Sequence, residues 1–186
     1  MRVIAGTARH LTLQTPKGDK VRPTTDRIKE TLFNMIQGRI YNARFLDLFA
    51  GSGGIGIEAL SRGASFCVFS DRDQQALACI RANLAHTKLA DRAQVLAGDY
   101  SRNLTRLRGG EAFDIIFMDP PYGSGLEAKA LQTIAADGLL REDGIIIAET
   151  GTDTDLSKDL PQGWRISRIK VYKTNQHVFI ERGEQP

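Results

Sequence analysis

The sequence has few of the residues that mark small disulfide-rich or metal-binding proteins. Cys67 and Cys79 are the only two cysteines among 186 residues, and no CxxC spacing occurs. Neither a disulfide framework nor a structural zinc site is therefore expected. His10, His86 and His177 lie far apart in the sequence, without metal-ligand spacing. We therefore predict no metal site and treat all three histidines as ordinary residues.

Long apolar runs are also missing. Neither a secretion signal nor an apolar stretch long enough to cross a bilayer is recognisable, so we expect a cytoplasmic protein without a membrane partner. Apolar residues make up 41% of the chain and charged residues 25%, which is typical of an ordinary globular protein. The length predicts a single domain covering residues 1–186, large enough to bury a substantial core.

Charge is unevenly distributed along the chain. Residues 1–40 hold eight Lys/Arg and three Asp/Glu, a net charge of +5, whereas the remainder holds 17 and 19, a net charge of −2. A basic amino-terminal arm on a nearly neutral body suggests contact with a polyanion. An ordinary solvated polar face would explain the same charges.

Alternating patterns predict an α/β fold. Apolar runs alternate with helical segments from Arg44 onward, which indicates a parallel sheet with helices on both faces. The runs are FLDLF, FCVFS, QVLAG, DIIFM and GIIIAE. Two β-rich runs flank residues 173–175 near the end of the chain, so we expect a carboxyl-terminal hairpin whose last strand pairs antiparallel.

The amino-terminal region predicts two further elements. RVIAG and LTLQTP read as a small β-hairpin, which makes residues 1–22 a basic β-hairpin extension of a catalytic core spanning residues 23–186. RPTTDRIKETLFNMI then predicts a helix. Thr24 or Thr25 can cap this helix, and Asp26 suits the positive end of its dipole.

The glycine-rich stretch LDLFAGSGGIG, residues 46–56, is a candidate cofactor loop, because open α/β sheets bind ligands beyond the carboxyl ends of their strands. Gly51, Gly53 and Gly56 fit G-x-G-x-x-G between a strand and a helix. That motif alone does not separate nicotinamide cofactors from other nucleotide-like ligands. Asp47 favours S-adenosylmethionine, because a carboxylate beside the loop would repel a pyrophosphate but suits an ammonium and a sulfonium.

Acids also end the next two predicted strands. Asp71 follows Gly51 at the interval, about 20 residues, at which an acid meets ribose hydroxyls in such folds. It could instead cap the following helix, although Asp73 could fill that role. Asp99 could accept the adenine amino hydrogen, with Tyr100 beside the ring, but a helix cap explains Asp99 equally well.

The stretch FDIIFMDPPYGSG, residues 113–125, is the candidate catalytic motif. Asp119 and the carbonyl of Pro120 can accept the hydrogens of an exocyclic amine, so that its lone pair faces an activated methyl group. Pro120 and Pro121 fix the backbone that carries these acceptors. Tyr122 offers a flat face on which an extruded base can stack. The alternative is a rigid turn without function.

Together these motifs resemble a known family. LDLFAGSGGIGIEALSRGA with DPPY resembles the class I S-adenosylmethionine-dependent methyltransferases that act on amino groups, which implies a Rossmann-like fold with a mostly parallel seven-stranded sheet. RPTTDRIKETLFN and RVIAGTARHLTLQTP narrow the resemblance to the bacterial 16S ribosomal RNA guanine-N2 methyltransferases, the RsmD-like family. The implied reaction methylates N2 of one guanine in 16S ribosomal RNA, presented within a small-subunit assembly particle.

The same resemblance implies particular site residues. It places the catalytic motif on residues 119–122. Its cofactor contacts fall on Asp47, Phe49, Gly51, Ser52, Gly53, Asp71 and the neighbourhood of Asp99. Arg22, Thr24 and Arg27 fit the methionine end of the cofactor, RNA phosphate, or simple capping of the first helix. The candidates for RNA-phosphate contacts in the basic arm are Arg2, Arg9, Lys17 and Lys20.

Three other functions remain open from the residues alone. A DNA or RNA adenine-N6 or cytosine-N4 methyltransferase would use the same acid-Pro-Pro-aromatic motif, although the chain offers no room for a separate DNA target-recognition domain. A nicotinamide-dependent oxidoreductase would explain the glycine loop but not Asp47 or the DPPY motif. A non-catalytic RNA-binding protein could keep the fold, but the intact Asp119 and glycine loop argue against it.

Overall fold

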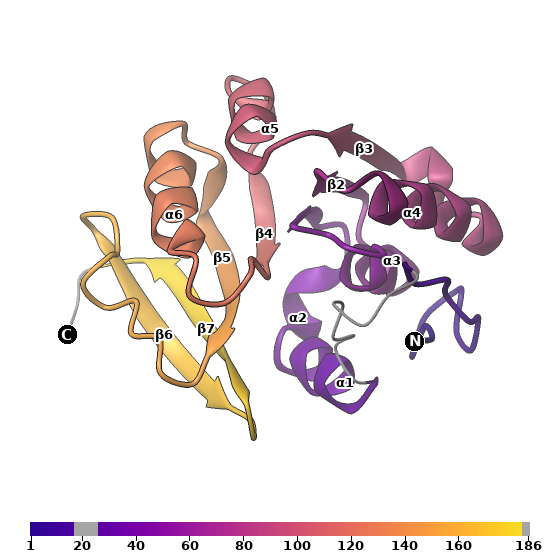
Figure 1. Cartoon of the computed structure of the whole chain (residues 1–186), viewed down its shortest axis with the longest axis horizontal. Helices are drawn as coiled ribbons and strands as arrows, with labels where there is room; N and C mark the ends of the chain where they lie inside the picture. Colours follow the sequence, from indigo (N-terminus) through magenta and orange to yellow (C-terminus); the bar gives the residue numbers. More distant parts are fainter. Residues whose placement is uncertain (17–25, 184–186) are drawn as a thin grey trace.

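A single seven-stranded sheet forms the centre of the molecule (Figure 1). The computed structural model of the chain describes residues 1–16 and 26–183. The strand order is β3-β2-β1-β4-β5-β7-β6. The strands are β1 (Arg44–Leu48), β2 (Phe66–Asp71), β3 (Ala93–Ala97), β4 (Phe113–Met118), β5 (Leu140–Gly151), β6 (Trp164–Val171) and β7 (Asn175–Arg182).

The pairing confirms the predicted sheet. Strands β1 to β5 pair in parallel, and β7 pairs antiparallel with both of its neighbours, β5 and β6. The chain runs outward from β1 to β2 and β3, then returns to place β4 on the other side of β1. The topological switch point therefore lies between β1 and β4, where Leu48 is in register with Met118. The loop after β1 and the loop after β4 are therefore neighbours at this edge of the sheet.

Two apolar clusters pack the helices onto opposite faces of this sheet. Residues of α1, α3 and α4 share one cluster with Phe45 and Ile115, whereas residues of α5 and α6 share the other with Leu46 and Ile116. The alternation of neighbouring strand residues between faces is the two-residue period of a β-strand. The helices are α1 (Asp26–Met35), α2 (Gln37–Ile40), α3 (Gly54–Ser61), α4 (Gln74–Thr87), α5 (Tyr100–Leu107) and α6 (Leu126–Ala136), with a 3₁₀ turn η1 at Ala90–Arg92. Within the described ranges, no helix has the length and apolar character needed to span a bilayer.

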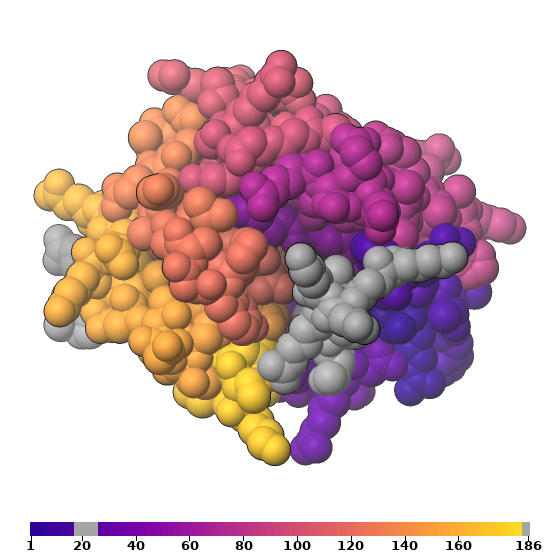
Figure 2. Space-filling model, in the orientation of Figure 1, coloured from indigo at the N-terminus to yellow at the C-terminus, as the bar shows by residue number. Residues whose placement is uncertain are grey.

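The amino-terminal segment, residues 1–16, differs from the predicted hairpin. Its two arms meet in a single antiparallel bridge between Arg2 and Thr12, and no regular strand forms within the segment. The reason is that side chains of α3 and α4 take up its backbone groups. Glu58 accepts from the N–H groups of Ile4 and Ala5 at 2.8 and 3.0 Å. The segment therefore packs on the helices, and its two arms do not form a regular β-ladder with each other. Figure 2 shows the segment in indigo against the purple and magenta surface.

Helix α1 confirms the predicted first helix, with one unexpected burial. It begins at Asp26 and buries Leu32 and Phe33 as its apolar face. Both predicted caps, Thr24 and Thr25, lie outside the described residues. Lys29, a charged residue, is also fully buried in this helix. Its ammonium donates to the carbonyl of Arg2 at 2.5 Å and lies 3.3 Å from Glu58, so it ties α1 to both the amino-terminal segment and α3.

Candidate active site

The glycine loop after β1 is held by two carboxylates. Gly53 adopts φ = 78° at the start of α3, a left-handed conformation that favours glycine. Asp47 accepts a hydrogen bond from the N–H of Gly56 at 2.8 Å, and Asp71 accepts one from the N–H of Gly51 at 2.7 Å. The loop is thus anchored at both ends by acids from β1 and β2. This rigid, side-chain-poor turn can approach a ligand closely.

The third glycine of the motif has a packing role. A Cβ on Gly56 would lie 2.3 Å from the ring of Phe69 and 2.7 Å from the sulfur of Cys67, both on β2. Only glycine therefore lets α3 lie this close to the sheet, which fixes the amino end of α3 above the carboxyl ends of the strands. Among the predicted motif glycines, Gly53 is therefore needed for the turn and Gly56 for the packing of α3 on the sheet.

Asp47 lies beneath the loop rather than on the surface. Its side chain is buried, and burial raises its pKa to about 7, with the hydrogen bond from Gly56 opposing and the charge of Asp71 adding to the shift. A buried carboxylate at this position makes the site favourable for a cation by its field. Direct contact between Asp47 and a cofactor remains a prediction.

Asp71 and Asp73 have separate roles in the bend after β2. Asp73 caps α4, since its carboxylate accepts from the N–H groups of Gln75 and Ala76. Asp71 instead accepts from the N–H groups of Gly51 and Asp73. The helix-cap alternative for Asp71 is therefore wrong, and the carboxylate of Asp71 lies against the glycine loop. Its contact with ribose hydroxyls stays a prediction.

Asp99 is the cap of α5. Its carboxylate accepts from the N–H and the hydroxyl of Ser101 at 2.9 and 2.7 Å, and these hydrogen bonds lower its pKa. The capping alternative thus describes this residue, while its adenine contact remains untested. Tyr100 packs on Phe49, with ring centroids 5.3 Å apart, so the end of β1 meets the start of α5 in an aromatic pair. Phe49 adopts φ = 68°, a conformation uncommon outside glycine.

Asp119 directly follows β4, in the loop that leads to α6 (Figure 1). Its N–H donates to the carbonyl of Leu48 at 3.4 Å, which puts it beside the start of the glycine loop. Burial, then the charges of Glu149, Asp47 and Glu127, raise the pKa of Asp119 to about 8. Carboxylates from β1, β5, α6 and the loop after β4 therefore share one low-dielectric site. A cationic ligand would relieve their mutual repulsion.

Tyr122 stands at the mouth of this site. Its side chain is about half exposed (47%), and its hydroxyl donates to Glu149 on β5 at 3.1 Å. Pro120 is buried and Pro121 is exposed, so the rigid pair crosses from the core to the surface between Asp119 and Tyr122. The four residues of the predicted motif thus place a carboxylate inside and an aromatic ring outside.

Sequence reasoning missed three buried polar residues behind Tyr122: Glu149, Asn175 and His177. Asn175 donates to Glu149 at 2.6 Å, and the Nε2 of His177 lies 3.2 Å from the other carboxylate oxygen. His177, expected to be ordinary, is fully buried in this cluster. Glu149 follows the apolar run GIIIA, so the strand-end rule that found the other acids would have found it. Its partners on β7 carry no comparable signal.

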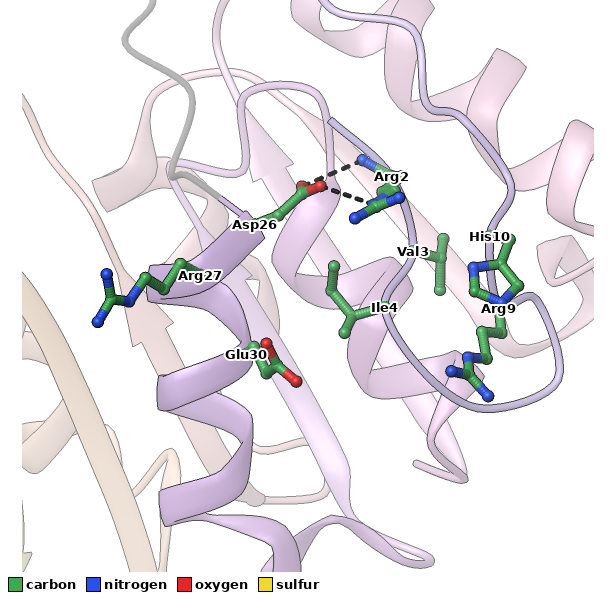
Figure 3. A pocket seen from close by; sticks show the side chains of 8 residues that line it. All are labelled: Arg2, Val3, Ile4, Arg9, His10, Asp26, Arg27 and Glu30. Atoms are coloured by element: carbon green, nitrogen blue, oxygen red, sulfur yellow. Dashed lines mark hydrogen bonds and ion pairs between the residues drawn. The ribbon is translucent and has the colours of Figure 1, made fainter.

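Three of the predicted basic residues, Arg2, Arg9 and Arg27, line a pocket of about 400 Å³ between the amino-terminal segment and α1. Figure 3 shows Arg2, Arg9 and His10 on the segment, facing the helix that carries Arg27. Asp26 pairs with Arg2 at 2.9 Å, which neutralises one of the three arginines. Lys17, Lys20, Arg22 and Thr24 lie outside the described residues. Over the described ranges, no cluster of His, Cys, Asp and Glu has the makeup of a metal site.

Fold and site together define the class of protein. The sheet order, the antiparallel β7, the glycine loop after β1 and the acid-Pro-Pro-Tyr loop after β4 are those of a class I methyltransferase. S-adenosylmethionine is the methyl donor of this class, and a carboxylate-lined site suits its ammonium and sulfonium.

The chain belongs to the family described as "Conserved hypothetical protein 95", whose model matches residues 1–181. YlbH of Bacillus subtilis is 45% identical over 182 residues, covering 93% of this chain and 98% of YlbH. Ribosomal RNA small subunit methyltransferase D of Escherichia coli is 35% identical over 185 residues, covering 100% of this chain and 91% of that protein. The solved structure of yhhF from Escherichia coli superposes with a TM-score of 0.86 at 33% identity, covering 100% of this chain and 99% of yhhF. These matches confirm the RsmD-like resemblance.

Proposed function

We propose that this protein transfers a methyl group from S-adenosylmethionine to the N2 amine of a guanine in 16S ribosomal RNA, within a small-subunit assembly particle in the cytoplasm. The adjacency of the glycine loop and the Asp119 loop at the switch point carries the proposal, because Leu48 and Met118 are paired neighbours. Full-length similarity to the Escherichia coli protein named for small-subunit ribosomal RNA supports the substrate. The motif itself suits any exocyclic amine, so the choice of guanine N2 rests on the family.

The chain's own residues would orient and deprotonate the amine. The cofactor supplies an electrophilic methyl carbon. The Asp119 carboxylate and the Pro120 carbonyl accept the two amine hydrogens, which directs the nitrogen lone pair toward that carbon. Positive charge would develop on the nitrogen during methyl transfer, and Asp119 would take the surplus proton from it. Burial and the neighbouring carboxylates raise the pKa of Asp119 to about 8 in the free protein, and the positive charge of the cofactor would lower that pKa, so that Asp119 could act as the base.

The remaining predicted residues would hold the cofactor. Asp71, already against the glycine loop, would accept the ribose hydroxyls with its remaining lone pairs. The Phe49–Tyr100 pair would offer an aromatic surface for adenine, with Asp99 next to Tyr100 in the chain. Ser52, between Gly51 and Gly53 in the glycine loop, stays a predicted cofactor contact. Asp47 would favour the ammonium and sulfonium by its field from below the loop.

Two arginines of the basic pocket are proposed RNA contacts. Arg9 and Arg27 lie on opposite sides of the pocket, and no described residue forms an ion pair with either. Arg2 offers less, because Asp26 already pairs with it at 2.9 Å. Lys17 and Lys20 stay candidates from the sequence alone. Phosphate contacts from this arm would set the register of the RNA while the Asp119 loop selects the base.

A methyl-transfer assay tests the proposed function. Small subunits from cells lacking the protein are incubated with the purified enzyme and tritiated cofactor, and the labelled nucleoside is identified by chromatography. We expect N2-methylguanosine from the wild type. Asp119→Ala should lose at least about 10²-fold in transfer, the lower range for a general base, and keep its affinity for S-adenosylhomocysteine.

Two outcomes would count against parts of this proposal. Label on adenine N6 or cytosine N4 would favour the alternative amino-methyltransferase. Turnover of Asp119→Ala within a few-fold of the wild type would remove Asp119 from the chemistry, because its carboxylate is the only one that the DPPY motif contributes.

A further inference from the structure

A buried polar cluster lies behind the DPPY loop, and the proposed reaction does not use it. Glu149 on β5 is 5% exposed, and its carboxylate accepts three hydrogen bonds. Asn175 and Tyr122 donate to Oε1 at 2.6 and 3.1 Å, and His177 lies 3.2 Å from Oε2. Two of these partners are buried on β7, whereas Tyr122 projects from an exposed loop. The cluster thus joins the rigid sheet to the mouth of the site.

Strand pairing fixes the inner part of the cluster. Glu149 is directly opposite His177 in the antiparallel pair of β5 and β7, and Asn175 lies opposite Gly151 in the same ladder. The second ring nitrogen of His177 lies 3.3 Å from the hydroxyl of Tyr172. Each carboxylate oxygen of Glu149 therefore faces a donor whose backbone is held by sheet hydrogen bonds. The position of the carboxylate is set before any substrate arrives.

Burying a carboxylate in this way is costly unless it is fully hydrogen-bonded, and apolar packing would often serve the core as well. Burial alone would raise the pKa of Glu149, but His177, Asn175 and Tyr122 outweigh it, and the pKa lies below its ordinary value. The group facing Tyr122 is therefore a carboxylate anion. A hydroxyl bound to an anion is held about twice as strongly as one bound to a neutral acceptor.

We propose that Glu149 is a positioning residue for Tyr122, and that it fixes the ring as a preformed platform for the target base. This inference rests on the proposed function and deepens it. Residues 121–125 are all exposed, so the bond from the Tyr122 hydroxyl to Glu149 ties this surface loop to the buried sheet. Anchoring the hydroxyl limits the rotamers of the ring in advance, and binding of the base then no longer has to order it.

The test compares variants that separate the hydroxyl, the acceptor and the charge. Tyr122→Phe removes only the hydroxyl and keeps the ring. Glu149→Gln keeps an oxygen that can accept from Tyr122, whereas Glu149→Ala removes it. We expect Tyr122→Phe to raise the KM for the small subunit about tenfold, the effect of one charge-assisted hydrogen bond, with unchanged cofactor affinity and Tm. The KM of Glu149→Gln for the small subunit, measured at saturating cofactor, should stay within about threefold of the wild-type KM, because a neutral acceptor weakens the bond from Tyr122 without removing it.

The double variant makes the test decisive. If Glu149 acts through the Tyr122 hydroxyl, Tyr122→Phe adds nothing further in a Glu149→Ala background. Independent, multiplying losses would overturn the proposal, as would a Tyr122→Phe enzyme with wild-type KM or a Glu149→Gln enzyme as impaired as Glu149→Ala. Should Glu149→Ala fail to fold, the Tyr122→Phe and Glu149→Gln measurements still decide. A wild-type protein without any transfer would instead contradict the proposed function.

Discussion

At the scale of single residues, the site is governed by carboxylates that lack enough positive charge around them. Asp47 and Asp119 both have raised pKa values, about 7 and about 8, and burial is the main cause for each. In solution such groups keep a proton that the same residues would lose in the unfolded chain. A site of this kind is electrostatically incomplete until a cation enters it. The shifted values are therefore a physical argument for a cationic ligand, independent of any sequence motif.

This shift at Asp47 predicts how stability depends on pH. The folded state holds the proton up to about pH 7, whereas an unfolded aspartate releases it near pH 3.8. The contribution of Asp47 to the free energy of unfolding is therefore fully present below its pKa in the unfolded chain, and it is lost as pH rises through its pKa in the folded protein. Asp47→Asn keeps an acceptor for Gly56 but cannot ionise. The free energy of unfolding of the wild type should fall relative to Asp47→Asn between pH 4 and 7, by at most about 1.4 kcal/mol per pH unit.

Urea unfolding of both proteins at several pH values, without ligand, measures this difference. Other titrating groups affect the two proteins alike, so only the difference curve reports on Asp47. A flat difference across the range would mean that Asp47 is ionised in the free protein. The argument for an incomplete cation site would then rest on Asp119 alone.

At the scale of elements, the amino-terminal segment is a well-anchored part of the body. Asn83 on α4 accepts from the N–H of Gln14 and donates to the carbonyls of Gln14 and Ser52, which links the segment to the glycine loop. Glu58 and Lys29 form a buried ion pair beneath it. The basic pocket thus has one wall pinned to α3 and the other formed by α1. A positioned pair of charged walls suits the fixed spacing of a nucleic-acid backbone.

This arrangement predicts a specific change in the salt dependence of RNA binding. Arg9→Ala should weaken binding to the small subunit and reduce the slope of log K against log salt by about 1, because one phosphate contact is lost. Cofactor affinity should not change, since Arg9 lies on the amino-terminal segment, where it lines the basic pocket, and not in the glycine loop or the Asp119 loop. Arg168→Ala is the matched control, because Arg168 is an exposed arginine on the edge strand β6. Filter binding at several salt concentrations measures both slopes, and equal slopes for Arg9→Ala and the wild type would exclude Arg9 from the interface.

Prediction from sequence worked best for elements whose signal is local. Strands β1, β2, β4 and β5 were found because a strand buried on both faces is a continuous apolar run. The amino-terminal hairpin was wrong in detail because its backbone partners, such as Glu58, lie far away along the sequence. The Glu149 cluster was missed for the same reason, since His177 and Asn175 meet it only through strand pairing. Long-range polar pairs leave no periodic pattern in a sequence.

At the scale of the whole molecule, the sheet topology brings predicted site residues from four strand ends to one edge of the sheet, which we call the predicted four-loop site. Gly51 and Asp119 lie in the loops after β1 and β4, Asp71 is the last residue of β2, and Asp99 follows β3; these strands are adjacent in the order β3-β2-β1-β4. A ligand that contacts all four loops ties together segments that the intervening helices separate widely in the sequence. Its binding should therefore stabilise the molecule as a unit rather than one loop.

That coupling predicts which ligand raises the Tm and through which residue. S-adenosylhomocysteine at about 100 times its Kd should add about 2.7 kcal/mol to the stability of the folded state. For a chain of this length, that corresponds to several degrees, at roughly 2–4 °C per kcal/mol. NADH should give no shift, because a pyrophosphate beside Asp47 and Asp71 is repelled. A rise in Tm with NADH and none with S-adenosylhomocysteine would favour the alternative function, a nicotinamide-dependent oxidoreductase.

Asp71 and Asp73 offer a matched pair within the same experiment. Asp71→Ala should abolish most of the shift, because it removes the proposed ribose acceptor and the anchor of Gly51. Asp73→Ala should lower the starting Tm through the lost α4 cap, by about 1 kcal/mol, and leave the ligand shift intact. Differential scanning fluorimetry of the three proteins, each with and without ligand, separates the two roles. If S-adenosylhomocysteine raised the Tm of Asp71→Ala as much as that of the wild type, another residue of the four-loop site would have to bind the ribose.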